Sequence, residues 1–145
     1  ANLLYGIPVS IWYDWKNDGD NPSDFEHNCG TVTSDLVPKP AYITAQAMNS
    51  HLKGFTLLKR IVTEDEQDFL LLFKNNEGKY KLCAWTTDED HQVILRDIVK
   101  PAAPVHGYDG QGNPQKVKTD HGNIILEIKA LPQYVCLPAD KVQEK

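Results

Sequence analysis

The sequence has few cysteines, no long hydrophobic run and no excess of basic residues, and each shortage excludes a class of protein. The three cysteines, Cys29, Cys83 and Cys136, are widely spaced and form no C-x-x-C pair, so a zinc knuckle is not predicted. No stretch approaches the roughly 18 apolar residues that a membrane-spanning helix needs. The net charge is −5, from 15 Lys and Arg against 20 Asp and Glu, which leaves no basic surface for phosphates. We therefore expect neither a membrane nor a nucleic-acid partner.

The remaining composition is that of a soluble globular chain. The chain has 145 residues, of which 41% are hydrophobic and 24% charged. This length suits one domain, or one small domain with a remnant of another. Residues 7–15 are rich in β-branched and aromatic types and predict a strand. Because that segment is apolar on both faces, it is typical of the middle of a parallel sheet, so we expect its neighbours to come from a larger protein.

A loop and a helix are predicted after this strand. Residues 16–33 are rich in Asn, Asp, Gly, Pro and Ser, and a loop of that length inside a compact domain is usually functional. Pro40 suits the first turn of a helix, and apolar residues then recur at helical spacing as far as Leu52. Gly54 is placed to end the helix. The sequence therefore predicts one β/α unit with a helix over about residues 39–53.

The second half of the sequence predicts an antiparallel β-sandwich of about seven or eight strands. Short apolar segments are divided by turn signals, with "NNEG" at 75–78 and "DHGN" at 120–123 as hairpin turns. The expected strands are 56–63, 68–75, 79–87, 91–99, 115–119, 123–129 and 133–138. The overall fold class is therefore mostly β, with domains at 1–54 and 55–145.

The aromatic segment at 12–15 is the strongest candidate for a binding surface. In a strand, Ser10, Trp12 and Asp14 would share one face, with Val9, Ile11 and Tyr13 on the other. If the strand belongs to a β/α barrel, the first face would look inward at the rim where such barrels bind substrate. A tryptophan there offers a flat surface to a sugar ring. The alternative is that Trp12 and Trp15 are core residues.

The other patterns give weak chemical signals. The acids of "DGDNPSDFE" fail the EF-hand template, and Asp20 and Asp24 are equally suited to forming turns. The five histidines show no metal-binding spacing. Asp14 with Glu26 is the one carboxylate pair considered for glycosidic chemistry. We therefore expect no metal, no cofactor and no catalytic residue in this chain.

Three motifs resemble a known enzyme group. "IWYDWKNDG", "EHNCG" and "DLVPKPAY" are similar to the last barrel strand, loop and helix of clan A retaining glycoside hydrolases, closest to cellulase-like and family-thirty-nine-like members. Cys29 departs from the pattern, which has an aromatic there. The resemblance covers roughly residues 6–54 and implies that the fold is the remnant of a (β/α)8 barrel, followed by a C-terminal β-sandwich.

The resemblance also implies roles and partners. The two catalytic glutamates of such enzymes would lie upstream of Ala1, so the parent protein would hydrolyse O-glycosidic bonds while this chain alone would be inactive. Trp12 would line the sugar subsite, with Asp14, Asn17 and Glu26 binding substrate or bracing the rim, and Trp15 beside them. The implied partners are a carbohydrate substrate and the rest of the barrel. Secretion or a periplasmic location is favoured, and a cytoplasmic one stays open.

Two other functions compete with this one. The chain could be a non-catalytic carbohydrate-binding or structural module, in which case Trp85 or Tyr108 would be exposed for contact. Alternatively, the sandwich only stabilises the barrel. We expect the stabilising role, because the strands are rich in interior-type residues.

Overall fold

The computed structural model describes residues 1–98 and 104–138. The chain divides into two compact units, residues 1–50 and 51–145, and the division falls within the last turn of the long helix. The elements are η1 (Glu26–Asn28), α1 (Pro40–Leu52), β1 (Phe55–Ile61), β2 (Asp68–Asn75), β3 (Tyr80–Thr86), β4 (His91–Leu95), β5 (His106–Tyr108), β6 (Pro114–Gln115), β7 (Lys118–Asp120), β8 (Asn123–Ile128) and β9 (Gln133–Leu137).

The helix α1 confirms the prediction for residues 39–53. Pro40 is its first residue, where the fixed φ of proline suits a helix and the missing N–H costs nothing. Gly54 follows the end of the helix with a φ of 79°, a conformation that glycine adopts without strain.

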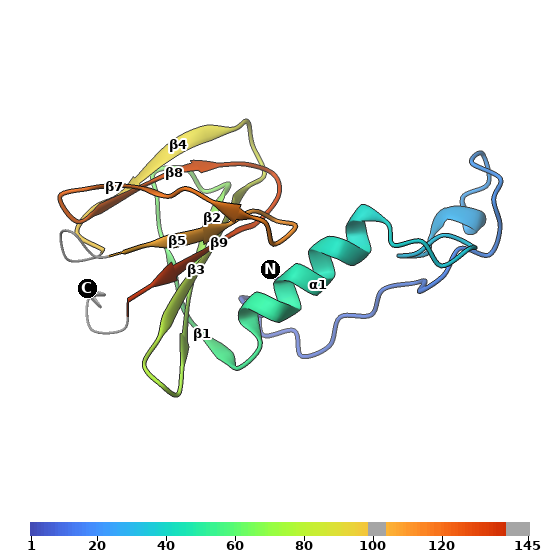
Figure 1. The fold of residues 1–145 in the computed structure, drawn as a ribbon, viewed down its shortest axis with the longest axis horizontal. Coiled ribbons are helices and arrows are strands. Elements are labelled where there is room, and N and C mark those ends of the chain that lie inside the picture. Colours follow the sequence, from blue (N-terminus) through green and yellow to red (C-terminus); the bar gives the residue numbers. More distant parts are fainter. Residues whose placement is uncertain (99–103, 139–145) are drawn as a thin grey trace. The chain divides into compact units, whose positions relative to one another are not determined.

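Within residues 1–98 and 104–138, nine strands form two antiparallel sheets, which confirms the mostly β fold class. The larger sheet has the order β1-β2-β3-β9-β5-β6, and the smaller has the order β4-β8-β7. Figure 1 shows the smaller sheet stacked over the larger one. β9 completes the larger sheet, because it pairs with β3 on one side and with β5 on the other.

The hydrophobic core lies between the two sheets. Alternate residues of each strand point into it, as the pleat of a strand requires. In β2 these are Leu70 and Leu72, and in β8 they are Ile124, Leu126 and Ile128, none more than 2% exposed. β3 and β9 add Leu82, Ala84, Val135 and Leu137 to the same cluster.

Both hairpin turns are confirmed. In the first, the side chain of Asn75 accepts hydrogen bonds from the backbone N–H groups of Glu77 and Lys79, and Gly78 has a φ of 75°. In the second, His121 and Gly122 have φ values of 46° and 93°. Such positive values suit the right-handed twist of the flanking strands β7 and β8.

The strand predicted at residues 7–15 is wrong, since these residues adopt no regular structure. A strand is stable only when its backbone groups pair with a neighbour. Among the described residues, the backbone pairing of this segment with a distant part of the chain is limited to Asp14 and Trp15, at its end. The two-faced arrangement of Ser10, Trp12 and Asp14 opposite Val9, Ile11 and Tyr13 is therefore absent too.

Two further segments differ clearly from the prediction, and one strand was not predicted. The strand expected at 91–99 ends at Leu95, and position 99 lies outside the described residues. The segment expected at 115–119 is shared between β6 and β7. β5 was not predicted, because its three residues show no alternation. Among the described residues, no helix combines the length and the apolar composition needed to cross a membrane.

Candidate functional site

The candidate binding residues lie on an exposed loop of the first unit. Trp12 is 66% exposed and Trp15 is 60% exposed, so within the first unit neither is a core residue. Ile11 and Tyr13, on either side of Trp12, are exposed as well. A large patch of exposed apolar side chains on a protein surface often marks an interaction site.

Hydrogen bonds between two parallel segments hold this loop. The backbone N–H of Asp14 and the indole Nε1 of Trp12 both donate to the carbonyl oxygen of Cys29, at 3.1 and 3.2 Å. The backbone N–H of Thr31 donates to the carbonyl oxygen of Asp14 at 3.0 Å. Lys16 and Val32 then form a parallel bridge. The indole of Trp12 is therefore tethered by one hydrogen bond to a residue 17 positions along the chain.

Asn17 is a structural residue of the loop. Its side chain is only 8% exposed, and its Oδ1 accepts hydrogen bonds from the backbone N–H of Gly30 and from Nζ of Lys39. Lys39 also donates to the carbonyl oxygen of Asn28 at 2.8 Å. A Cβ at Gly30 would lie 2.2 Å from the backbone nitrogen of Asn17. The backbones at Gly30 and Asn17 therefore approach so closely that only a glycine fits at position 30.

The other two candidates occupy the edge of this loop. Asp14 is half-buried, and its carboxylate accepts a hydrogen bond from the backbone N–H of Trp15. Glu26 is exposed, and its backbone N–H donates to the carboxylate of Asp24 at 3.1 Å. Asp20 accepts a hydrogen bond from the hydroxyl of Ser34. Asp20 and Asp24 thus order the loop, as the turn-forming alternative predicts.

Tyr13 is a residue that the sequence reasoning missed. The negative charges of Glu26, Asp18 and Asp14 raise the pKa of its phenol, with Glu26 the strongest cause. These carboxylates are therefore near enough to this exposed phenol to disfavour its ionised form. An aromatic surface edged with carboxylates can stack on a sugar ring while accepting hydrogen bonds from its hydroxyls. The alternation of side chains along the predicted strand had placed Tyr13 on the face opposite Trp12.

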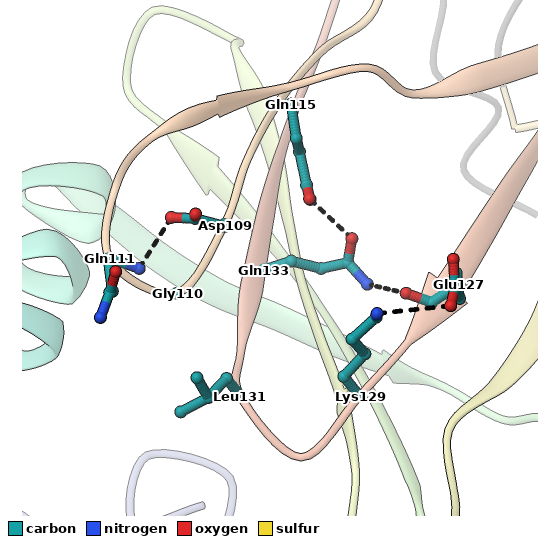
Figure 2. A pocket seen from close by; sticks show the side chains of 8 residues that line it. All are labelled: Asp109, Gly110, Gln111, Gln115, Glu127, Lys129, Leu131 and Gln133. Atoms are coloured by element: carbon teal, nitrogen blue, oxygen red, sulfur yellow. Dashed lines mark hydrogen bonds and ion pairs between the residues drawn. The ribbon is translucent and has the colours of Figure 1, made fainter.

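The second unit has a small pocket (Figure 2) with a volume of about 240 Å³, lined mostly by residues with polar side chains. Its side chains are bonded to one another: Nε2 of Gln115 donates to Oε1 of Gln133 at 2.8 Å, and Nε2 of Gln133 donates to the carbonyl oxygen of Glu127 at 2.9 Å. Lys129 forms an ion pair with Glu127 at 3.3 Å. Because these groups already bind each other, the pocket is better suited to fixing the strand ends than to holding a ligand.

The two aromatic residues considered for a binding module are packed against neighbours. Tyr108 lies beside His51, with ring centroids 4.5 Å apart. Trp85 is stacked on Phe69 at 4.9 Å, with 4° between the ring planes. Neither ring is a free platform on the surface of the sandwich.

Comparison with solved structures relates the chain to glycoside hydrolases. It is similar to a family 39 glycoside hydrolase from the gut symbiont Bacteroides cellulosilyticus WH2, with 32% identity and a TM-score of 0.73 over 88% of this chain and 26% of that chain. It is also similar to the catalytic domain of the family 30 xylanase C from Talaromyces cellulolyticus, with 12% identity and a TM-score of 0.59 over 79% of this chain and 27% of that one.

A third similar structure is a family 30 subfamily 8 xylanase from Clostridium acetobutylicum, with 8% identity and a TM-score of 0.56 over 74% of this chain and 30% of that one. The two xylanases show a shared fold alone, because their identity is low. No protein-family model matches the sequence, and no curated protein matches it significantly. The chain spans 26 to 30% of the length of these structures, and is thus related to part of a glycoside hydrolase.

Proposed function

We propose that the chain is the C-terminal portion of a retaining glycoside hydrolase. In this proposal, residues 1–54 supply the last strand, loop and helix of a (β/α)8 barrel, and the β-sandwich is an accessory domain. The observation that carries it is the likeness to the Bacteroides family 39 enzyme, which includes sequence identity as well as fold. The motifs "IWYDW" and "KPAY" support the assignment of the first unit.

Residues 7–15 form no strand in this structure, and in the proposal they would become one only when paired with the rest of the barrel. Val9, Ile11 and Trp12 are 65%, 88% and 66% exposed, which is costly in water for such large apolar side chains. The rest of the barrel would cover the aliphatic side chains and supply the missing strand pairing. It is therefore the first partner that we propose.

The carbohydrate substrate is the second proposed partner. Trp12 would stack on the sugar at the cleavage site, held in orientation by its hydrogen bond to Cys29. Asp14, Glu26 and Trp15 would line the same rim. Asn17 would act indirectly, since its buried side chain orders the loop. The two glutamates that break the bond would belong to the upstream part of the barrel.

Activity measurements test this function in two steps. The 145-residue chain alone should give no turnover on aryl glycosides or polysaccharides. A chimera that joins the barrel of the Bacteroides enzyme to this chain should be active, and Trp12→Ala should lower its kcat/KM by roughly tenfold. Trp85→Ala, on the sandwich, is the matched control and should leave kcat/KM unchanged. Turnover by the isolated chain would contradict the proposal, as would an active chimera that is insensitive to Trp12→Ala.

The sandwich is proposed to stabilise the barrel. Trp85 is covered by Phe69, and Tyr108 packs on His51, which weighs against the alternative of a carbohydrate-binding module. Titration of the isolated chain with polysaccharides separates the two roles. Saturable binding that is lost in Trp85→Ala or Tyr108→Ala would favour the module instead.

A further inference from the structure

Two acidic connections meet at one end of the β-sandwich. Residues 62–67, between β1 and β2, read VTEDEQ, and residues 87–90, between β3 and β4, read TDED. Gln67 ties them together, because its side chain bonds to Thr87 and Asp88 at 3.1 and 3.2 Å. Asp68 and His91 begin the strands that follow, and both line a cavity of about 520 Å³.

The carboxylate of Asp68 is buried with one oxygen unsatisfied. The residue is 1% exposed, and its Oδ1 has no hydrogen-bond partner, although Nε2 of His91 lies 3.2 Å from it. Its Oδ2 accepts a hydrogen bond from the hydroxyl of Thr63 at 3.0 Å. A buried carboxylate oxygen without a hydrogen-bond donor is costly, and in native proteins a bound ion or water commonly completes such a site.

The ring of His91 is oriented toward that carboxylate. Its Nδ1 lies 2.8 Å from the carbonyl oxygen of Glu89, and because a carbonyl only accepts, Nδ1 carries the hydrogen. Nε2 then faces Asp68 at 3.2 Å from each of its oxygens. If the ring is neutral, Nε2 carries a lone pair and faces the negative carboxylate of Asp68. That arrangement is repulsive unless a cation lies between the two groups. A histidine that ligates a metal is typically held in this way, by a carbonyl on its other nitrogen.

Asp65 supplies a third donor. One ligand atom each from Asp65, Asp68 and His91 lies within 4.8 Å of the other two. The charge around them favours a cation, because residues 62–67 and 87–90 each contain three carboxylates. Metal–ligand bonds of about 2.0–2.2 Å would require the three atoms to close in slightly.

We propose that Asp65, Asp68 and His91 bind one divalent transition-metal ion of the Zn²⁺ class. The ligands would be one oxygen of each aspartate and Nε2 of His91, with water completing the coordination. The imidazole nitrogen favours Zn²⁺ over Ca²⁺ and Mg²⁺, which take oxygen ligands. Because β2 and β4 belong to different sheets, the ion would join the two sheets at this end of the sandwich.

Calorimetric titration of the chelator-treated 145-residue chain with ZnCl₂ tests the site. We expect saturable binding of one ion per chain, a rise in Tm on binding, and no saturable binding of Ca²⁺. Co²⁺ should produce a visible absorption band, which reports coordination directly. If the chain binds no Zn²⁺, the space between His91 and Asp68 holds a proton, and the proposal is wrong.

Variants locate the ion. His91→Gln and Asp65→Asn should each weaken Zn²⁺ binding by at least about tenfold. His121→Gln is the matched control, because His121 also contacts an aspartate, Asp120, but on an exposed turn. NMR of the histidine rings in the unaltered chain gives a readout that does not depend on the folding of any variant: Zn²⁺ should shift the His91 signals and leave those of His121 in place. Shifts confined to other histidines would overturn the assignment, as would full binding by both ligand variants.

Discussion

Nζ of Lys39 lies 3.1 Å from Oδ1 of Asn17, a contact that joins the start of the long loop to the residue before α1. The same oxygen accepts the backbone N–H of Gly30. A side chain that the sequence suggested for binding sugar is therefore buried and bonded within the loop.

Asn17→Ala should loosen this loop. The change leaves the N–H of Gly30 without its acceptor and removes one of two acceptors of the Lys39 ammonium group, at a cost of about 1–3 kcal/mol. Hydrogen exchange measured by mass spectrometry should be faster at Gly30 and Thr31. Asn17→Asp keeps an acceptor oxygen and is the control. In this variant, exchange at Gly30 and Thr31 should stay slow. Equal protection in the alanine variant would show that Asn17 does not hold the loop.

Leu82→Ala should destabilise the sandwich strongly. Leu82 is completely buried, and in the sheet it lies between Leu72 and Val135. Removing it should lower the free energy of unfolding by about 2–5 kcal/mol, because the neighbouring side chains cannot close the cavity. Urea denaturation measures the change. Leu131→Ala, at a leucine that is 57% exposed, should cost much less, and similar losses in both variants would contradict this view of the core.

His51 should make the stability of the second unit depend on pH. Its ring is stacked on Tyr134 at 4.7 Å and lies beside Tyr108. Burial, and then the charge of Lys81, lower its pKa below the ordinary 6.5. The unfolded chain therefore takes up the proton first as the pH falls, so this contribution is complete above pH 6.5 and is lost below it.

The His51→Phe variant isolates this effect. Phenylalanine keeps a ring against the two tyrosines but cannot bind a proton. Between about pH 7.5 and about pH 5, the free energy of unfolding should fall more in the unaltered chain than in the variant. Denaturation curves at several pH values give the comparison. Parallel pH profiles would mean that His51 titrates alike in the folded and unfolded states.

The cysteines should differ in reactivity. Burial raises the pKa of the Cys83 thiol to about 12, so almost none of it is thiolate at neutral pH. Cys29 lies half-buried on the first-unit loop. Under native conditions, alkylation followed by mass spectrometry should label Cys29 well before Cys83, and the difference should vanish in denaturant. Rapid native labelling of Cys83 would show that β3 opens readily.

The sequence predicts the elements whose signals are local. α1 follows from its apolar spacing together with Pro40 and Gly54, and the hairpin at Asn75 follows from turn chemistry. The segment at 7–15 has the composition of a strand, yet pairing depends on neighbours that local composition cannot reveal. For the same reason, alternation placed Trp12 and Tyr13 on opposite faces of a strand that does not form.

The candidate sites were predictable only in part. The exposure of Trp12 matches its proposed role at a surface, whereas the burial of Asn17 depends on Gly30 and Lys39, which are distant in sequence. The group of Asp65, Asp68 and His91 matches none of the sequence spacings that are typical of metal sites. Its members come from the ends of two connections that only the stacking of the two sheets brings together.

The position of β9 also has a consequence for how the chain folds. β1, β2 and β3 form a local meander, but β9 pairs with β3 in a register that joins Tyr80 to Leu137. Pairs so far apart carry a large loop-closure entropy and slow folding. During synthesis, the meander can form early, while the larger sheet stays open until residue 137 has left the ribosome. Until then the free edge of β3 is the surface on which misassembly would begin.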